Sequence, residues 1–273
     1  MAEKNNDYKI IIKNIKKIYD VLSDDEESSK NFLAVEDFSL NIKKGEFITI
    51  VGPSGCGKST VLDILAGLAK PTSGEIYIDD ELVKGPGFDR GIILQGYALF
   101  PWLNVEQNIE FGLEIKGISK RERKETAEKF INLVGLDKFK SRYPHELSGG
   151  MKQRVAIARA LAYDPEILLM DEPFAAVDAQ TREILQEELL TIWEKTKKTV
   201  IFITHSIEEA IFLADRVVVM KDNPGRIEKI IDLNLERPRN TANIRTSKEY
   251  NIVWNEIWQL LHDDRKEKQL DYI

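Results

Sequence analysis

A glycine-rich segment near the start of the chain has the composition of a phosphate-binding loop. The segment reads Gly52, Pro53, Ser54, Gly55, Cys56, Gly57, Lys58, Ser59 and Thr60. Glycines let the backbone curl so that its N–H groups point at phosphate oxygens, Lys58 neutralises the β- and γ-phosphates, and the Ser59 hydroxyl reaches Mg²⁺. The chemistry expected here is therefore the binding of a nucleotide together with magnesium.

The residues on either side of this loop fit a strand and a helix. Residues 45–51 read as an apolar strand that leads into the loop. Apolar side chains recur at helical spacing in residues 61–68, directly after it. A phosphate held there would meet the positive end of a helix dipole. The flanking elements therefore agree with a P-loop.

Further polar residues follow runs that read as strands. Residues 166–171 are nearly all apolar and predict a buried parallel strand that delivers two adjacent carboxylates, Asp171 and Glu172. Asp171 suits Mg²⁺ bound through water, and Glu172 suits an attacking water as general base. Gln95 ends one short apolar run, and His205 closes another. In isolation, Glu172 could merely end its strand and His205 could be a satisfied strand-end histidine.

A second anion-binding segment lies at residues 147–154. Ser148 stands where a helix begins, and Gly149 and Gly150 let backbone N–H groups approach a phosphate closely. This site cannot easily serve the P-loop of its own chain. The alternative is an ordinary capped helix with a glycine-rich start. That alternative would explain Ser148 but not the rest of the segment as far as residues 153–154.

Together these segments resemble the ATP-binding subunit of an ATP-binding cassette (ABC) transporter over roughly residues 8–235. The resemblance implies an α/β fold: a RecA-like P-loop NTPase core with an antiparallel β subdomain and an α-helical subdomain at about residues 97–163. It also implies hydrolysis of ATP with Mg²⁺. The amphipathic pattern in residues 236–273 predicts a C-terminal helical extension.

The resemblance also assigns roles to residues. In the family, Ser148 and its glycines face the γ-phosphate bound on the opposite subunit, so that a homodimer holds ATP at two composite sites. The expected catalytic residues are Lys58, Gln95, Glu172 and His205, and the expected metal ligands are Ser59, Gln95 and Asp171. The expected nucleotide contacts are Tyr19, residues 52–60, Gln95, Ser148, Gly149, Gly150, Asp178 and His205. Tyr19 would stack on adenine, although an aromatic residue at a strand end is as often part of the core.

Several shorter stretches narrow the resemblance to one branch of importers. Residues 99–105, 178–182, 186–190 and 224–227 look like those of the nitrate, sulfonate and taurine importers. In such importers two ATPase subunits drive two transmembrane permease subunits, which a solute-binding protein supplies, so this chain would contact that protein only indirectly. The expected location is peripheral, on the cytoplasmic face of the cell membrane. The transported solute is specified by those other chains.

Composition limits the other function classes. The 273 residues include 46 acidic and 39 basic side chains, and the net charge of -7 disfavours a broad electrostatic grip on nucleic acid. The single cysteine excludes an intrachain disulfide and fits the reducing cytoplasm. The longest apolar runs are of strand length, against the roughly 20 residues that cross a bilayer. Membrane attachment is therefore expected through partners.

Two other functions are weighed against the importer subunit. One is a soluble cassette ATPase that acts on nucleic acid or ribosomes, but such proteins usually carry paired cassettes or a long coiled coil. The sequence shows one cassette and no heptad array. The other is a nucleotide-binding subunit that has lost hydrolysis, against which the presence of Glu172 and His205 argues.

Three local expectations concern single segments. Residues 206–209, Ser-Ile-Glu-Glu, fit a capping box at the start of a helix. Residues 97–102 are unusually apolar for a loop, and either receive a helix of the transmembrane subunit or fill a seam between lobes. The polar run at residues 23–30 is expected to be a solvated hairpin tip.

Overall fold

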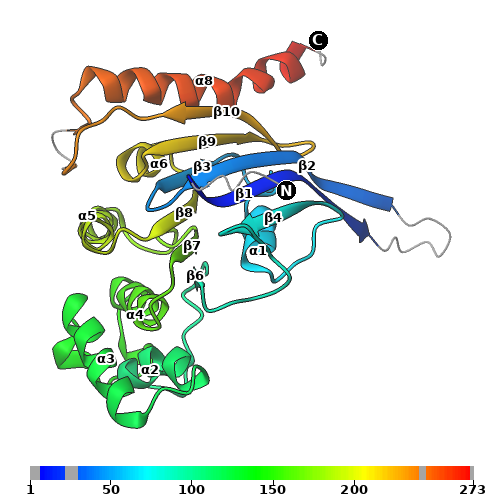
Figure 1. Cartoon of the computed structure of the whole chain (residues 1–273). Helices are drawn as coiled ribbons and strands as arrows, with labels where there is room; N and C mark the ends of the chain where they lie inside the picture. The colour runs from blue at the N-terminus through cyan, green and yellow to red at the C-terminus, as the bar shows by residue number, and fades with distance from the viewer. Residues whose placement is uncertain (1–6, 22–29, 240–243, 271–273) are drawn as a thin grey trace. The chain divides into compact units, whose positions relative to one another are not determined.

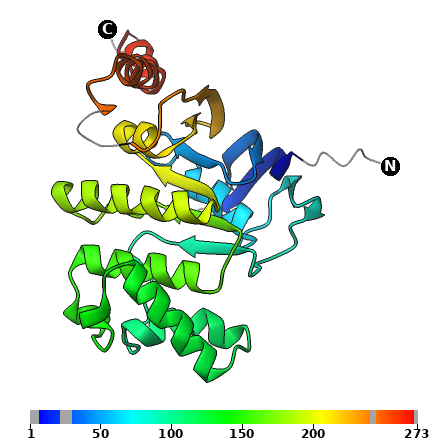
Figure 2. The same ribbon diagram turned by 60° about the vertical axis from the view of Figure 1, so that its left-hand side comes forward.

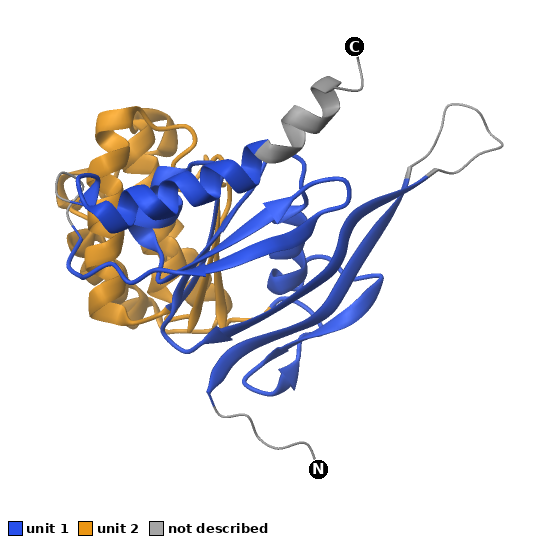
Figure 3. Ribbon diagram, turned by 90° about the horizontal axis from the view of Figure 1, so that it is seen from above, with its two compact units in different colours: residues 1–86, 199–273 blue, residues 87–198 orange. Residues whose placement is uncertain are grey.

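The computed structural model of the chain describes residues 7–21, 30–239 and 244–270. The chain forms two compact units, one of Met1–Pro86 with Thr199–Ile273 and the other of Gly87–Lys198 (Figure 3). Most of the run expected to be a solvated hairpin tip, residues 23–29, lies outside the described residues.

An antiparallel sheet in the first unit is built around a long hairpin (Figure 1). Its strand order is β2-β1-β4-β5, from β1 (Tyr8–Val21), β2 (Lys30–Lys43), β4 (Ser73–Ile78) and β5 (Glu81–Leu82). Ile10, Ile12 and Ile15 of β1 are buried in the core. The strand pairing continues past irregular steps in register, as far as Val21 opposite Lys30. In the sequence, the strand-like apolar runs of this region cover only residues 8–12 and 38–42. The two strands of the hairpin are therefore much longer than these runs predict.

A second set of strands in the first unit carries the P-loop. The order is β10-β9-β3-β8, from β3 (Phe47–Val51), β8 (Thr199–Thr204), β9 (Arg216–Lys221) and β10 (Arg226–Asp232). β3 pairs in parallel with both β8 and β9, and every residue of β3 and β8 is buried. Their near-continuous apolar sequences suit strands covered on both faces. Within the described residues the unit also contains the helices α1 (Lys58–Ala66), α6 (Ile207–Leu213) and α8 (Lys248–Leu270), of which α8 packs on α6 and β9.

The second unit combines a parallel strand pair with helices. β6 (Arg90–Ile93) pairs in parallel with β7 (Ile167–Asp171). The helices are α2 (Val105–Ile115), α3 (Lys120–Leu133), α4 (Gly149–Ala162) and α5 (Ala179–Thr196), with short 3-10 turns η1 (Asp137–Phe139) and η2 (Pro144–Glu146). α2, α3 and α4 pack on one another (Figure 2). No helix in the described part of the chain is both long and apolar enough to cross a membrane.

Candidate functional site

The P-loop connects the end of β3 to the start of α1. Gly55 and Gly57 have φ angles of 82° and 90°, in the left-handed region that other residues rarely adopt. Gly57 is also the N-cap residue of α1, where no side-chain hydrogen bond caps the helix. The first N–H groups of a helix need partners, and an anion can supply them. The backbone geometry is therefore that of a phosphate-binding loop.

Glycines in this loop are also required by packing. A Cβ atom on Gly52 would lie 2.7 Å from the Met220 carbonyl oxygen, and one on Gly57 would lie 2.8 Å from the Ala34 carbonyl oxygen. These neighbours are backbone atoms of strands, which cannot move aside as the end of a flexible side chain could. The loop is thus held closely against β9 and β2.

Lys58 has a buried side chain that is bonded within the loop. Its Nζ donates hydrogen bonds of 2.8 Å to the carbonyl oxygens of Gly52 and Pro53. Only 5% of the residue is exposed. The positive charge is therefore held inside the curl of the loop, where it can neutralise a bound phosphate. The neighbouring Cys56 is buried, and this burial raises the pKa of its thiol.

His205 lies beside the P-loop because β3 and β8 run in parallel register. Val51, the last residue of β3, lies opposite Thr204, the last residue of β8. The next residues, Gly52 and His205, therefore leave neighbouring strands at the same level. His205 is exposed. The structure thus brings together two segments of the predicted site that are far apart in sequence.

The helix after His205 begins differently from the sequence prediction. Ser206 accepts a hydrogen bond of 3.3 Å from the Glu209 N–H, as a capping box requires. The Glu209 carboxylate accepts from the Thr204 hydroxyl, however, and the Ser206 N–H donates to Thr204 Oγ1 at 3.0 Å. The reciprocal half of the predicted capping box is therefore wrong, because the threonine supplies a buried partner for both groups.

Asp171 and Glu172 lie in the second unit, at the end of β7. The four residues before Asp171 are buried, whereas both acids are half-buried. Glu172 has a φ angle of 41°, which is unusual for a residue with a side chain. Strained backbone conformations of this kind cluster at active sites. The chain turns at residues 173–176, so the two carboxylates stand at the end of the buried strand.

Gln95 is exposed in the loop after β6, and the residues that follow it are tightly held. Tyr97 and Ala98 have positive φ angles of 69° and 46°. The Arg159 guanidinium of α4 donates to both carbonyl oxygens, at 2.9 Å and 2.6 Å respectively. Tyr97 is buried, so it does not belong to the apolar surface expected at residues 97–102. Arg159 could not be found from the sequence, because no sequence pattern marks an arginine whose side chain binds the carbonyl oxygens of a distant loop.

The starts of α4 and α5 lie next to each other in the second unit. Ser148 caps α4 by accepting from the Met151 N–H, and Asp178 caps α5 by accepting from the Thr181 N–H at 3.0 Å. That hydrogen bond also lowers the pKa of Asp178. A Cβ atom on Gly150 would lie 2.8 Å from the Thr181 side chain. The predicted contacts at residues 148–150 and 178 are therefore neighbours.

Tyr19 lies near the end of the long hairpin, opposite Phe32. The residue is 39% exposed, which excludes the alternative that it is a core residue. Lys17 Nζ lies 4.8 Å from the centroid of the Tyr19 ring. An exposed ring of this kind can stack on a nucleobase.

The predicted site residues are thus divided between the two units. Tyr19, the P-loop and His205 belong to the first, and Gln95, Ser148, Gly149, Gly150, Asp171, Glu172 and Asp178 belong to the second. Within the described residues, no cluster of three or more His, Cys, Asp or Glu side chains could hold a metal ion by itself. Mg²⁺ does not require such a cluster, because it usually binds to one or two carboxylates together with substrate phosphates and water.

A P-loop at the end of a parallel strand and a second, glycine-rich helix start define a nucleotide-binding protein of the ATP-binding cassette class. A family model described as "ABC transporter" matches residues 35–175. The chain belongs to this family. It is accordingly an ATP-binding subunit that hydrolyses ATP in connection with membrane transport.

Several curated relatives are similar over most of the chain. An uncharacterized ABC transporter ATP-binding protein of Methanocaldococcus jannaschii is 53% identical, covering 94% of this chain and 92% of its own length. The nitrate import ATP-binding protein NrtD of Synechocystis sp. is 48% identical, covering 86% and 91%. The aliphatic sulfonates import ATP-binding protein SsuB of Bacillus anthracis is 48% identical, covering 82% and 87%.

A solved structure shares the fold. An ATP-binding cassette in a dimeric, post-hydrolysis state bound to ADP and Pi has a TM-score of 0.72 and 36% identity, covering 83% of this chain and all of that chain. The predicted fold class, an ABC ATPase cassette with an antiparallel β part and a helical part, is thereby confirmed.

Proposed function

We propose that the chain energises an importer for a small anionic or organic solute such as nitrate, a sulfonate or taurine. The similarity to the nitrate and aliphatic sulfonate import proteins supports this branch. The proposal that the chain hydrolyses ATP with the help of His205 is supported by the register between β3 and β8. Gly52 and His205 directly follow Val51 and Thr204, which are paired on adjacent strands. A residue next to the phosphate-binding loop is well situated to sense the terminal phosphate.

In the proposed mechanism each side chain has a distinct task. Lys58 neutralises the β- and γ-phosphates, and the N–H groups of the P-loop bind their oxygens. Glu172 accepts a proton from the attacking water, a role typically worth about 10² to 10⁴ in rate. His205 holds the γ-phosphate and water in line. Tyr19 stacks on adenine.

Magnesium would be held by Ser59, Gln95 and Asp171. A hydroxyl, an amide and a single carboxylate are hard oxygen ligands, as Mg²⁺ prefers, and they leave positions for phosphate oxygens and water. When bound, the ion supplies positive charge that neutralises the phosphates. The protein's contribution is to present these three oxygen ligands from the P-loop, the loop after β6 and the end of β7.

The proposed assembly is a homodimer on a membrane complex. Ser148, Gly149, Gly150 and Asp178 would complete the nucleotide site of a second copy, so that ATP closes the dimer and hydrolysis reopens it. The dimeric cassette structure with ADP and Pi supports this arrangement. The chain would be peripheral on the cytoplasmic face, bound to permease subunits and only indirectly linked to a solute-binding protein. We further propose that residues 8–235 form the ATPase domain and residues 236–273 an extension of it.

The alternative of a soluble cassette ATPase for nucleic acid or ribosomes is not favoured. The similar nitrate and aliphatic sulfonate proteins are named as import ATP-binding proteins. No observation on the described residues points to a nucleic acid partner.

Two substitutions and an uptake assay test the proposal. Lys58→Ala should abolish tight binding of MgATP, because the buried charge of the loop is lost. Glu172→Gln should retain binding, measured by titration, and slow phosphate release by about 10²-fold or more. With the permease complex in vesicles, ATP-dependent uptake of nitrate, a sulfonate and taurine would be compared. Tight binding by Lys58→Ala, or uptake of none of these solutes by an active complex, contradicts the corresponding part of the proposal.

A further inference from the structure

A closed set of hydrogen bonds surrounds the backbone of His205. The Thr204 hydroxyl donates to the Glu209 carboxylate, the Ser206 N–H donates to Thr204 Oγ1 at 3.0 Å, and the Glu209 N–H donates to Ser206 Oγ at 3.3 Å. We call Thr204, Ser206 and Glu209 the hydrogen-bond ring. The ring joins the residues immediately before and after His205 to the first turn of α6.

Two of the three ring residues are buried and Ser206 is half-buried, although the histidine that they bracket is exposed. Thr204 is 1% exposed and Glu209 is 6% exposed. Hydrogen bonds between buried polar groups are costly to leave unmade, so such a ring resists rearrangement. His205 therefore projects from a backbone whose two neighbouring residues are both held in place.

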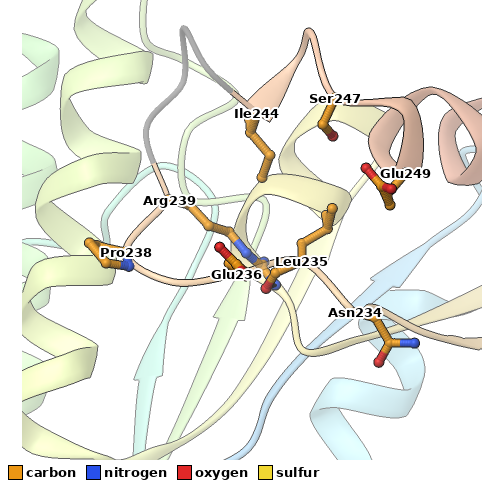
Figure 4. A pocket seen from close by; sticks show the side chains of 8 residues that line it. All are labelled: Asn234, Leu235, Glu236, Pro238, Arg239, Ile244, Ser247 and Glu249. Atoms are coloured by element: carbon orange, nitrogen blue, oxygen red, sulfur yellow. Dashed lines mark hydrogen bonds between the residues drawn. The ribbon is translucent and has the colours of Figure 1, made fainter.

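The helix that carries Glu209 is itself anchored at its middle and at its end. The buried Thr49 hydroxyl of β3 donates to the Ala210 carbonyl oxygen at 3.2 Å. At the C-terminal end, the Arg239 guanidinium donates to the carbonyl oxygens of Ile211, Phe212 and Ala214 at 3.1, 3.0 and 2.6 Å. Arg239 lies in the pocket of the C-terminal segment shown in Figure 4, where it binds the end of a helix whose carbonyls need donors.

We propose that Thr204 and Glu209 are positioning residues that set the location of His205 for ATP hydrolysis. This inference rests on the proposed role of His205. Because Val51 and Thr204 are paired, the P-loop and His205 share one rigid base, and the ring holds the histidine backbone relative to that base. Small displacements of a group that orients the reacting atoms reduce the rate strongly, whereas binding of the nucleotide elsewhere on the loop is unaffected.

The test compares two buried threonines of the same sheet. Thr204→Val removes the ring hydroxyl, and Thr49→Val removes a hydroxyl that binds α6 outside the ring, so Thr49→Val is the matched control. We expect Thr204→Val to lower the kcat of ATP hydrolysis by about tenfold or more, with a KM for ATP changed less than twofold. Thr204→Ser, which keeps the hydroxyl, should restore kcat. Thr49→Val should lower the melting temperature but leave kcat within about twofold.

A second readout follows the histidine itself. The chain contains three histidines, so the imidazole resonances of His205 can be assigned by substitution. Thr204→Val and Glu209→Gln should change the His205 signals, and Thr49→Val should not. Glu209→Gln also serves if Thr204→Val does not fold. Equal losses of kcat in both valine variants, or unchanged His205 signals in the ring variants, would overturn the proposal.

His205→Ala separates this inference from the proposed function. If His205→Ala hydrolyses ATP at the rate of the parent, the proposed role of His205 fails, and the positioning role fails with it. If His205→Ala is slow while Thr204→Val keeps the parent's kcat, only the positioning role is wrong.

Discussion

At the scale of single residues, the P-loop glycines meet two different requirements, and Gly57 meets both. The positive φ angles of Gly55 and Gly57 give the loop the curl that phosphate binding needs. At Gly52 and Gly57 a side chain would also collide with carbonyl oxygens of β9 and β2. Sequence reasoning identified the first requirement, because it follows from the loop's own pattern. The second depends on which strands lie behind the loop, and the local pattern contains no information about that.

Cys56 offers a test of the same packing. The residue is 1% exposed, and burial raises the pKa of its thiol. The reactive thiolate is therefore scarce at neutral pH and inaccessible, and alkylation should be at least about tenfold slower in the folded chain than in the unfolded chain. Because Cys56 is the only cysteine, mass spectrometry of the intact protein after iodoacetamide treatment measures the rate directly.

A neighbouring position provides the control for this measurement. Ser54 is exposed in the same loop, so a Ser54→Cys, Cys56→Ala variant should be alkylated at nearly the rate of the unfolded chain. Rapid alkylation of Cys56 in the folded parent would show that the loop opens more readily than its packing implies.

At the scale of elements, the sequence predicted the buried strands well and the hairpin and helix start less well. β3, β7 and β8 are continuous apolar runs, so their type and position are evident. In β1 and β2 the pairing extends through polar residues such as Lys17 and Asp20, because backbone hydrogen bonds to the partner strand continue where the apolar pattern stops. Ser206 caps α6 as predicted, but a bond between the Glu209 carboxylate and Thr204 of the preceding strand stands in place of the predicted reciprocal bond.

The loop before α2 presents two aromatic residues with different environments. Phe100 packs on Phe111, with ring centroids 4.3 Å apart, whereas Trp102 is 70% exposed. The loop is fixed by Asn108, which accepts from the Phe100 N–H at 2.9 Å and donates to the Leu103 carbonyl at 2.8 Å. A large exposed aromatic residue on a rigid loop is a good candidate for an interface with a partner.

We therefore expect Trp102→Ala to weaken assembly with the permease, since loss of an interface aromatic residue typically costs about 2 kcal/mol of binding free energy. Basal ATP hydrolysis by the free subunit should stay within about twofold of the parent rate. Copurification and uptake by the reconstituted complex measure the effect. Trp258→Ala, which removes another exposed tryptophan in the other unit, is the control. Phe100→Ala should instead lower the melting temperature. Normal assembly and uptake with Trp102→Ala would remove this loop from the interface.

At the scale of the whole molecule, the site residues are distributed over two units that each fold around their own contacts. The sequence predicted which residues these are through the spacing of short motifs. It could not show how Ser148 and Asp178 become neighbours, because that depends on the packing of α4 against α5 around Gly150 and Thr181. We propose that these two neighbouring helix starts form one surface for the phosphate bound on a second copy.

That surface leads to the prediction about assembly. A Glu172→Gln variant, which binds ATP without rapid hydrolysis, should form a homodimer in the presence of MgATP and remain a monomer without it. Size-exclusion chromatography with light scattering measures the mass. Adding Ser148→Arg should abolish the dimer, because a long side chain would block the helix start. Ser119→Arg is the matched control, since Ser119 caps α3 in the same unit and its loss should cost a similar amount, about 1 kcal/mol. A dimer that survives Ser148→Arg, or one that Ser119→Arg abolishes equally, would place the contact between subunits elsewhere.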